Sequence, residues 1–115
     1  MTLLIVDDNP NFRHLLKRYL RIADADCEEC ENGAQAVVAY NRHRHDWVLM
    51  DVEMDEMDGL AATRQILAAD PQAQVVIVTQ YDDEHCRTAA GEAGACAFVA
   101  KENLQSVREI LRIDG

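Results

Sequence analysis

The chain has 115 residues, with 11 Lys or Arg against 21 Asp or Glu, so its formal net charge is −10. This length and an apolar content of 49% fit one folded domain, residues 1–115, and exclude a disordered chain. The negative charge opposes direct binding to nucleic acid or to an anionic membrane surface. Apolar runs fall far short of the roughly 18 residues of a membrane span. Since the start also lacks the basic region of a signal peptide, we expect a cytoplasmic protein.

The first half of the chain alternates apolar runs with stretches of helical period. Residues 3–6 predict a strand, and an Asp-Asp-Asn-Pro turn leads into a helix. The expected apolar face of that helix consists of Phe12, Leu15, Leu16, Tyr19 and Leu20. A weaker strand at 26–30 is flanked by charges, which favours the edge of a sheet. Asn32-Gly33 then opens a helix expected over residues 34–44.

The second half repeats this alternation. We expect, in chain order, a strand at 47–50, a helix at 60–69, a strand at 75–78, a helix at 83–93, a strand at 97–100 and a helix at 104–113. Strands that alternate with helices are typical of parallel sheets with crossover helices. The sequence therefore predicts an α/β fold with a doubly wound, five-stranded parallel sheet made of five strand–helix units.

Two patterns resemble metal sites, but a simpler interpretation suits each. Cys27 and Cys30 lie three residues apart, so on a strand they point to opposite faces and cannot converge on one ion. His43 and His45 lie near a helix end, where we expect solvated side chains rather than metal ligands. We therefore expect reduced thiols and no metal at either place.

Polar residues with matching chemistry follow four of the predicted strands. Asp7 and Asp8 follow the first strand, Asp51 the third, Thr79 the fourth and Lys101 the fifth. Ligands of open parallel sheets bind at the carboxyl ends of the strands, so these side chains should share one edge. Any one of them has an ordinary structural explanation, such as a helix cap. Their joint placement at the strand ends indicates a binding site.

Three carboxylates at one edge repel each other unless a cation lies among them. Oxygen ligands without imidazole or thiolate favour a hard divalent ion, and Mg²⁺ typically takes one or two carboxylates and then a phosphate oxygen. A lysine and a hydroxyl opposite that ion suit the other oxygens of a phosphoryl group. The residues thus predict a Mg²⁺-dependent phosphoryl site.

The motifs around these residues match a known family along nearly the whole chain. They are Leu3-Leu4-Ile5-Val6-Asp7-Asp8, Met50-Asp51-Val52-Glu53-Met54 with Met57-Asp58-Gly59, Val76-Ile77-Val78-Thr79, and Gly94-Ala95 before Phe98-Val99-Ala100-Lys101. In combination they resemble the receiver domain of bacterial two-component response regulators. The resemblance implies a flavodoxin-like fold and a cytoplasmic phosphoprotein of phosphorelay signal transduction.

The resemblance also implies a role for each site residue. Asp51 would take a phosphoryl group from a sensor histidine kinase or a phosphotransfer protein, and Lys101 and Thr79 would contact the phosphoryl oxygens. Mg²⁺ would be held by Asp7, Asp8, Asp51 and the backbone carbonyl of Glu53. Thr79 and Phe98 would form the switch. Such a domain catalyses its own phosphorylation and dephosphorylation but acts as a signalling switch rather than an enzyme. Its expected output is partner binding or homodimerisation through residues 83–113.

Three positions depart from the family's pattern. Four residues after the nucleophile, the family usually has Pro, and this chain has Asp55. Directly after the lysine of the family's pattern, here Lys101, Pro is common, and this chain has Glu102. Gln80 replaces a small residue, which predicts narrower access for the phosphodonor.

Two alternatives remain open from the sequence. A pseudo-receiver would bind partners without phosphorylation. The departures at Asp55 and Gln80 keep this alternative open, but the chain retains all the acceptor residues, which counts against it: Asp7, Asp8, Asp51, Thr79 and Lys101. A Mg²⁺-dependent phosphatase would also use an aspartyl phosphate. It commonly has a second Asp two residues after the nucleophile, where this chain has Glu53, and it needs room for a substrate segment.

Overall fold

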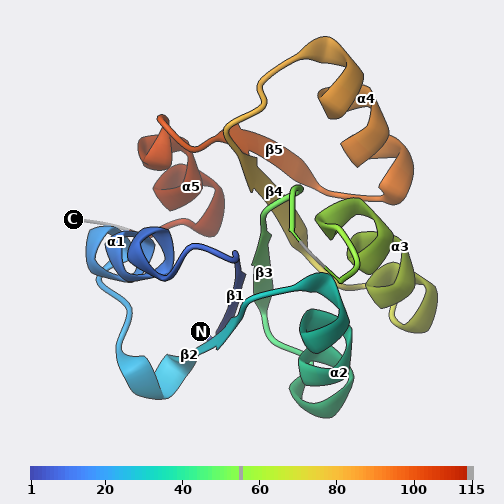
Figure 1. The fold of residues 1–115 in the computed structure, drawn as a ribbon. Helices are drawn as coiled ribbons and strands as arrows, with labels where there is room; N and C mark the ends of the chain where they lie inside the picture. The colour runs from blue at the N-terminus through green and yellow to red at the C-terminus, as the bar shows by residue number, and fades with distance from the viewer. Residues whose placement is uncertain (55, 114–115) are drawn as a thin grey trace.

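The computed structural model describes residues 1–54 and 56–113. Its strands form one parallel sheet in the order β2-β1-β3-β4-β5 (Figure 1). The strands are β1 (Leu3–Val6), β2 (Cys27–Cys30), β3 (Trp47–Met50), β4 (Val75–Thr79) and β5 (Ala97–Ala100). The predicted five-stranded parallel sheet is confirmed, with β2 at an edge as its charges indicated.

Helices cover both faces of this sheet. They are α1 (Pro10–Leu20), α2 (Gly33–His43), α3 (Gly59–Ala69), α4 (Glu84–Ala93) and α5 (Leu104–Leu111), with a short 3-10 turn at Asp24–Asp26. On one side α1 and α5 bury Leu3 and Ile5 of β1, and on the other α2, α3 and α4 cover Leu4 and Val6 (Figure 1). Alternate residues of each strand therefore enter different cores, which makes the fold doubly wound.

Element ends differ from the expected ones by a few residues. Thr79 is the last residue of β4 rather than the first loop residue. Asp83 lies before α4 as its cap, because its side chain accepts a hydrogen bond from the Cys86 amide. The last helix stops at Leu111, since Arg112 has a left-handed backbone (φ 59°) that ends the helix.

The predicted apolar face of α1 is only partly correct. Leu16 and Leu20 are buried against the sheet, but Leu15 is 53% exposed and Tyr19 is 38% exposed. Leu16 and Leu20 lie four residues apart and share one face, whereas Leu15 and Tyr19 lie about 100° further around the helix. The buried stripe is narrower than the apolar stripe of the sequence.

His45 also differs from expectation, because it is buried rather than solvated. Only 6% of this residue is exposed, and its Nε2 lies 2.9 Å from Glu28 Oε1. Arg44 has a left-handed backbone (φ 48°) that ends α2, so His45 lies in the turn between α2 and β3. The expected opposite orientation of Cys27 and Cys30 is confirmed, because they contribute to different cores. None of the four cysteines, which all lie within the described residues, forms a disulfide.

Within residues 1–54 and 56–113, none of the helices has the length and apolar character that crossing a bilayer requires.

Candidate functional site

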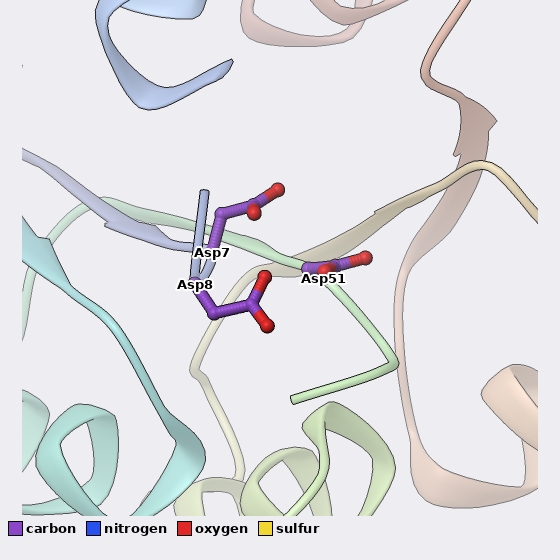
Figure 2. Close-up of side chains that lie close together, drawn as sticks. All are labelled: Asp7, Asp8 and Asp51. Atoms are coloured by element: carbon purple, nitrogen blue, oxygen red, sulfur yellow. The ribbon is translucent and has the colours of Figure 1, made fainter. Parts of the chain in front are cut away.

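The predicted site residues gather at the carboxyl edge of the sheet. Asp7 and Asp8 follow β1, Asp51 follows β3, and Lys101 follows β5. One carboxylate oxygen from each of Asp7, Asp8 and Asp51 lies within 4.8 Å of the others. Figure 2 shows the three side chains reaching into the same space beyond the strand ends. The structure thus brings together the carboxylates that follow two different strands of the sequence.

The three carboxylates differ in exposure. Asp7 and Asp51 are only 2% and 6% exposed, whereas Asp8 is exposed. Burial and the nearby Asp7 carboxylate raise the pKa of Asp51 to about 6, although Lys101 acts in the opposite direction. Asp51 is therefore a carboxylate whose negative charge is costly in the folded protein, and a cation would relieve that cost.

Lys101 supplies a positive charge at this edge. Its Nζ lies 2.7 Å from Asp7 Oδ2 and 3.7 Å from Asp51 Oδ2. The contact with Asp7 is an ion pair without the angles of a hydrogen bond, because Asp7 Oδ2 has no hydrogen-bond partner among the described residues. The backbone amide of Lys101 also donates to the Thr79 carbonyl at 2.8 Å. Thr79 itself is fully buried.

The first turn of α1 contributes two residues that the sequence analysis missed. The Phe12 ring lies 4.4 Å below Lys101 Nζ, and Arg13 donates from Nη1 to the Asp7 carbonyl at 2.6 Å. Arg13 also pairs with Glu29 of β2 at 2.8 Å. Their position just after the helix cap Asn9 was the available signal, since a helix that starts after β1 must direct its first turn toward the strand ends.

Local sequence explains how the loops hold the cluster. Asn9 begins α1 by accepting hydrogen bonds from the amides of Asn11 and Phe12, and its own amide donates to Asp7 Oδ1 at 2.9 Å. In the loop after β3, a Cβ on Gly59 would lie 1.8 Å from the Asp51 carbonyl oxygen. Only glycine therefore allows α3 to start this close to Asp51.

Glu53 and Phe98 are placed differently from the central cluster. Glu53 is exposed and, with Asp8, Val52, Met54 and Asp58, lines an open cleft of about 510 Å³. Phe98 is half-buried on the side of β5 that α2, α3 and α4 cover, and Arg87 Cζ lies 4.7 Å from its ring centroid. The predicted Asp55 departure lies outside the described residues.

The donor set fits a hard divalent cation. Three carboxylates converge, two of them buried, and a buried Asp7 oxygen lacks a hydrogen-bond donor among the described residues. Oxygen-only ligands of this kind suit Mg²⁺, which also binds phosphoryl oxygens. An ionised carboxylate beside such a cation and a lysine can act as a nucleophile toward phosphorus, because both positive groups offset the charge of the incoming phosphoryl group.

Comparison with known proteins points to one family. A family model for the response regulator receiver domain matches residues 3–112. The chemotaxis protein CheY of Listeria monocytogenes is 37% identical over 102 residues, which are 88% of this chain and 86% of that protein. The transcriptional regulator NtrC of Escherichia coli is 35% identical over 84% of this chain but only 21% of its own length.

Solved structures give the same result. A two-component response regulator of the LuxR family from an Aurantimonas species has a TM-score of 0.83 at 28% identity, covering 96% of this chain and 84% of the other. The match to the family model, residues 3–112, includes all five strands of the sheet and the residues of the acidic cluster. The chain belongs to the response regulator receiver domain family of two-component systems.

Proposed function

We propose that residues 1–115 form one receiver domain in which Asp51 accepts a phosphoryl group from the phosphohistidine of a kinase or phosphotransfer protein. Receiver domains act as signalling switches and bind Mg²⁺ in an acidic pocket. The observation that carries the proposal is the convergence of Asp7, Asp8 and Asp51 within 4.8 Å, next to Lys101. A signalling switch suits this open edge better than a phosphatase, which would need a substrate-binding segment over it.

The transfer exchanges one bond for another. An Asp51 carboxylate oxygen attacks phosphorus, the bond from phosphorus to the donor nitrogen breaks, and an acyl phosphate forms. The histidine nitrogen keeps the electron pair. Asp51 needs no base because the reactive form is the carboxylate, so the protein's contribution is to position this oxygen and to offset charge.

The neighbouring residues hold the reacting groups. Asp7, Asp8, Asp51 and the Glu53 carbonyl would hold Mg²⁺, which when bound offsets the charge on the phosphoryl oxygens. Lys101 would bind another phosphoryl oxygen, and its 3.7 Å distance to Asp51 Oδ2 leaves it within reach. The Thr79 hydroxyl oxygen accepts a hydrogen bond from the Tyr81 amide at 3.2 Å, and its proton would be donated to a third phosphoryl oxygen.

The loop after Thr79 is connected to Phe98, the proposed switch residue, through Asp82 and Arg87. Asp82 lies three residues after Thr79 and pairs with Arg87 of α4, whose Nε and Nη2 lie 2.7 and 2.6 Å from Asp82 Oδ1. Arg87 in turn covers the Phe98 ring. Movement of Thr79 toward a phosphoryl group would shift this loop, release Arg87 from the ring and let Phe98 turn inward.

The available interactions match the size of such a switch. Moving a two-state equilibrium from 1:99 to 99:1 takes about 5.5 kcal/mol. Charge-assisted hydrogen bonds contribute about 1.5 to 3 kcal/mol each, so the bonds from Lys101 and Thr79 to a phosphoryl group supply most of it. The proposed output is altered partner binding, or homodimerisation, through the surface of α4, β5 and α5.

Intact mass after treatment with a small acyl phosphate or phosphoramidate tests the acceptor assignment. We expect a Mg²⁺-dependent gain of one phosphoryl group in the original chain and in the control Asp26→Asn, which changes an exposed carboxylate outside the site. Asp51→Asn should show no gain. Equal modification of Asp51→Asn would refute the assignment, and an unmodified original chain would favour the pseudo-receiver.

Amide chemical shifts with and without a beryllofluoride phosphoryl mimic test the switch. We expect changes around Asp51 and also across residues 84–111. Changes confined to the surroundings of Asp51 would refute the proposed switch while leaving phosphorylation intact.

A further inference from the structure

A shallow groove with positive charge lies between the C-terminal end of α1 and α5, away from the acidic site. Its volume is about 400 Å³, and its lining residues are Arg18, Tyr19, Arg21, Gln105 and Arg108. Among the described residues that line the groove, three of the five are arginines and none is acidic, in a chain of net charge −10. The groove thus concentrates positive charge on a protein that is otherwise strongly negative.

Two of these arginines are available for a ligand. Arg18 and Arg21 are exposed, and neither forms an ion pair with a carboxylate of residues 1–54 or 56–113. Their neighbour Lys17, in contrast, pairs with Asp24 at 2.6 Å and Glu29 at 3.1 Å. The acidic residues nearby therefore neutralise Lys17 and leave the two guanidinium groups for another anion.

Helix capping accounts for only part of this charge. The C-terminus of a helix carries about half a negative charge, which one cation offsets. At the end of α1, Arg108 already donates to the Tyr19 carbonyl at 2.9 Å, and Arg18 lies in the last turn. Arg21 ends α1 with a left-handed backbone (φ 57°), a conformation for which glycine is the usual residue. Ending the helix therefore does not explain why an arginine is found at this position.

The remaining residues of the groove offer a flat surface and a polar group. Tyr19 is 38% exposed, and Arg108 Cζ lies 5.8 Å from its ring centroid, which holds one side of the ring in place. The Tyr19 hydroxyl donates to Gln105 Oε1 at 3.0 Å, so the Gln105 amide nitrogen remains as a donor. A volume near 400 Å³ is within the range of small-molecule sites.

We propose that this groove binds a nucleoside polyphosphate. Guanidinium groups bind phosphate oxygens through paired hydrogen bonds, so Arg18 and Arg21 would hold the phosphates. The base would stack on Tyr19, with its edge near Gln105. The net negative charge of the chain opposes long polyanions such as DNA, whereas two local arginines suffice for one small anion.

This site is separate from the phosphoryl acceptor. Asp7 and Asp8 precede the first turn of α1, and the groove lies at the other end of this 11-residue helix. At about 1.5 Å per residue, the two ends are roughly 16 Å apart. A nucleotide in the groove would therefore not touch the Asp51 carboxylate.

Titration of the full chain with ADP tests the proposal, with amide chemical shifts as the measurement. EDTA removes Mg²⁺ and so excludes Mg²⁺-mediated binding at the acidic site, while low salt limits the screening of the exposed arginines. We expect saturable shifts at Arg18, Tyr19, Arg21, Gln105 and Arg108. Adenosine, which lacks phosphates, and pyrophosphate, which lacks the ring, should each bind at least about tenfold more weakly, a difference of about 1.4 kcal/mol.

Variants separate the roles of charge and ring. Arg18→Gln and Arg21→Gln should each weaken ADP binding several-fold, while Arg64→Gln, which removes an exposed arginine of α3, should leave it unchanged. Tyr19→Leu should weaken ADP but not pyrophosphate, and Tyr19→Phe should retain ADP binding.

Four results would overturn the proposal. They are the absence of saturable shifts at the groove, equal weakening by Arg64→Gln, pyrophosphate binding as tight as ADP, and tighter binding of an oligoglutamate peptide to the same residues. The last result would assign the groove to an acidic protein segment.

Discussion

Replacing Asp51 by Asn should stabilise the metal-free protein at neutral pH. The Asp51 carboxylate is buried close to Asp7, and its pKa lies at about 6 instead of 3.8. A raised carboxyl pKa means that the folded protein holds the proton more tightly than the unfolded chain does. The ionised form therefore destabilises the fold, and the neutral amide of Asn removes this destabilisation.

The size and the pH dependence follow from the two pKa values. Below pH 3.8 Asp51 is protonated in both states and costs nothing, and the cost grows as pH rises toward 6. With about 1.4 kcal/mol for each pKa unit, the full cost above pH 6 is about 3 kcal/mol, and at pH 5 the cost is roughly half as large. Asp51→Asn should raise the free energy of unfolding by up to these amounts.

Urea unfolding in EDTA at pH 5 and pH 8 measures both values. Glu92→Gln is the matched control, because it removes one negative charge from an exposed position of α4 and should change stability by less than about 0.5 kcal/mol. Excess Mg²⁺ should reduce the difference in unfolding free energy between Asp51→Asn and the original chain. Only the original chain keeps all three carboxylates, so the ion should stabilise it more. An Asp51→Asn variant no more stable than Glu92→Gln at pH 8 would refute the reasoning.

Three further predictions concern the cation, the switch and the loop. Millimolar Mg²⁺ in low salt should raise the melting temperature, and Asp8→Asn should weaken this response; a melting temperature indifferent to Mg²⁺ would contradict a preformed site. Arg87→Gln removes the cation over Phe98, so beryllofluoride should produce larger amide shifts across residues 84–111 at subsaturating concentration. Gly59→Ala places a Cβ against the Asp51 carbonyl and should cost about 1 to 3 kcal/mol in urea unfolding and slow phosphorylation.

The sheet and its polar edge could be predicted because each depends on short local signals. The β1 and β4 segments are runs of apolar residues, ended in β4 by Thr79, and the structure buries all of them. Such runs are expected in the interior of a sheet, and this expectation does not require the strand order to be known. Parallel strands place the residues that follow them at one edge, which is why Asp7, Asp51 and Lys101 could be grouped before any contact was known.

Contacts elsewhere in the fold could not be predicted in the same way. The burial of His45 depends on Glu28 of β2, seventeen residues earlier, and on the left-handed turn at Arg44. The exposure of Leu15 and Tyr19 depends on how much of α1 the sheet and α5 cover. Periodicity identifies an apolar stripe, but the neighbouring elements decide how wide a stripe is buried.

On the proposed mechanism, Lys101 is already placed close to the acceptor before phosphorylation. Its ammonium group lies nearer to Asp7 than to Asp51, at 2.7 against 3.7 Å, and the Phe12 ring holds it from below. The cation is therefore kept at the edge by a residue that does not react, which leaves the Asp51 carboxylate only partly neutralised. On the proposed mechanism, the phosphoryl group brings about 1.5 to 2 new negative charges, and Lys101 needs only a small movement to meet them. Because the Lys101 amide donates to the Thr79 carbonyl, that movement is felt directly at the end of β4, where the loop to Asp82 and Arg87 begins.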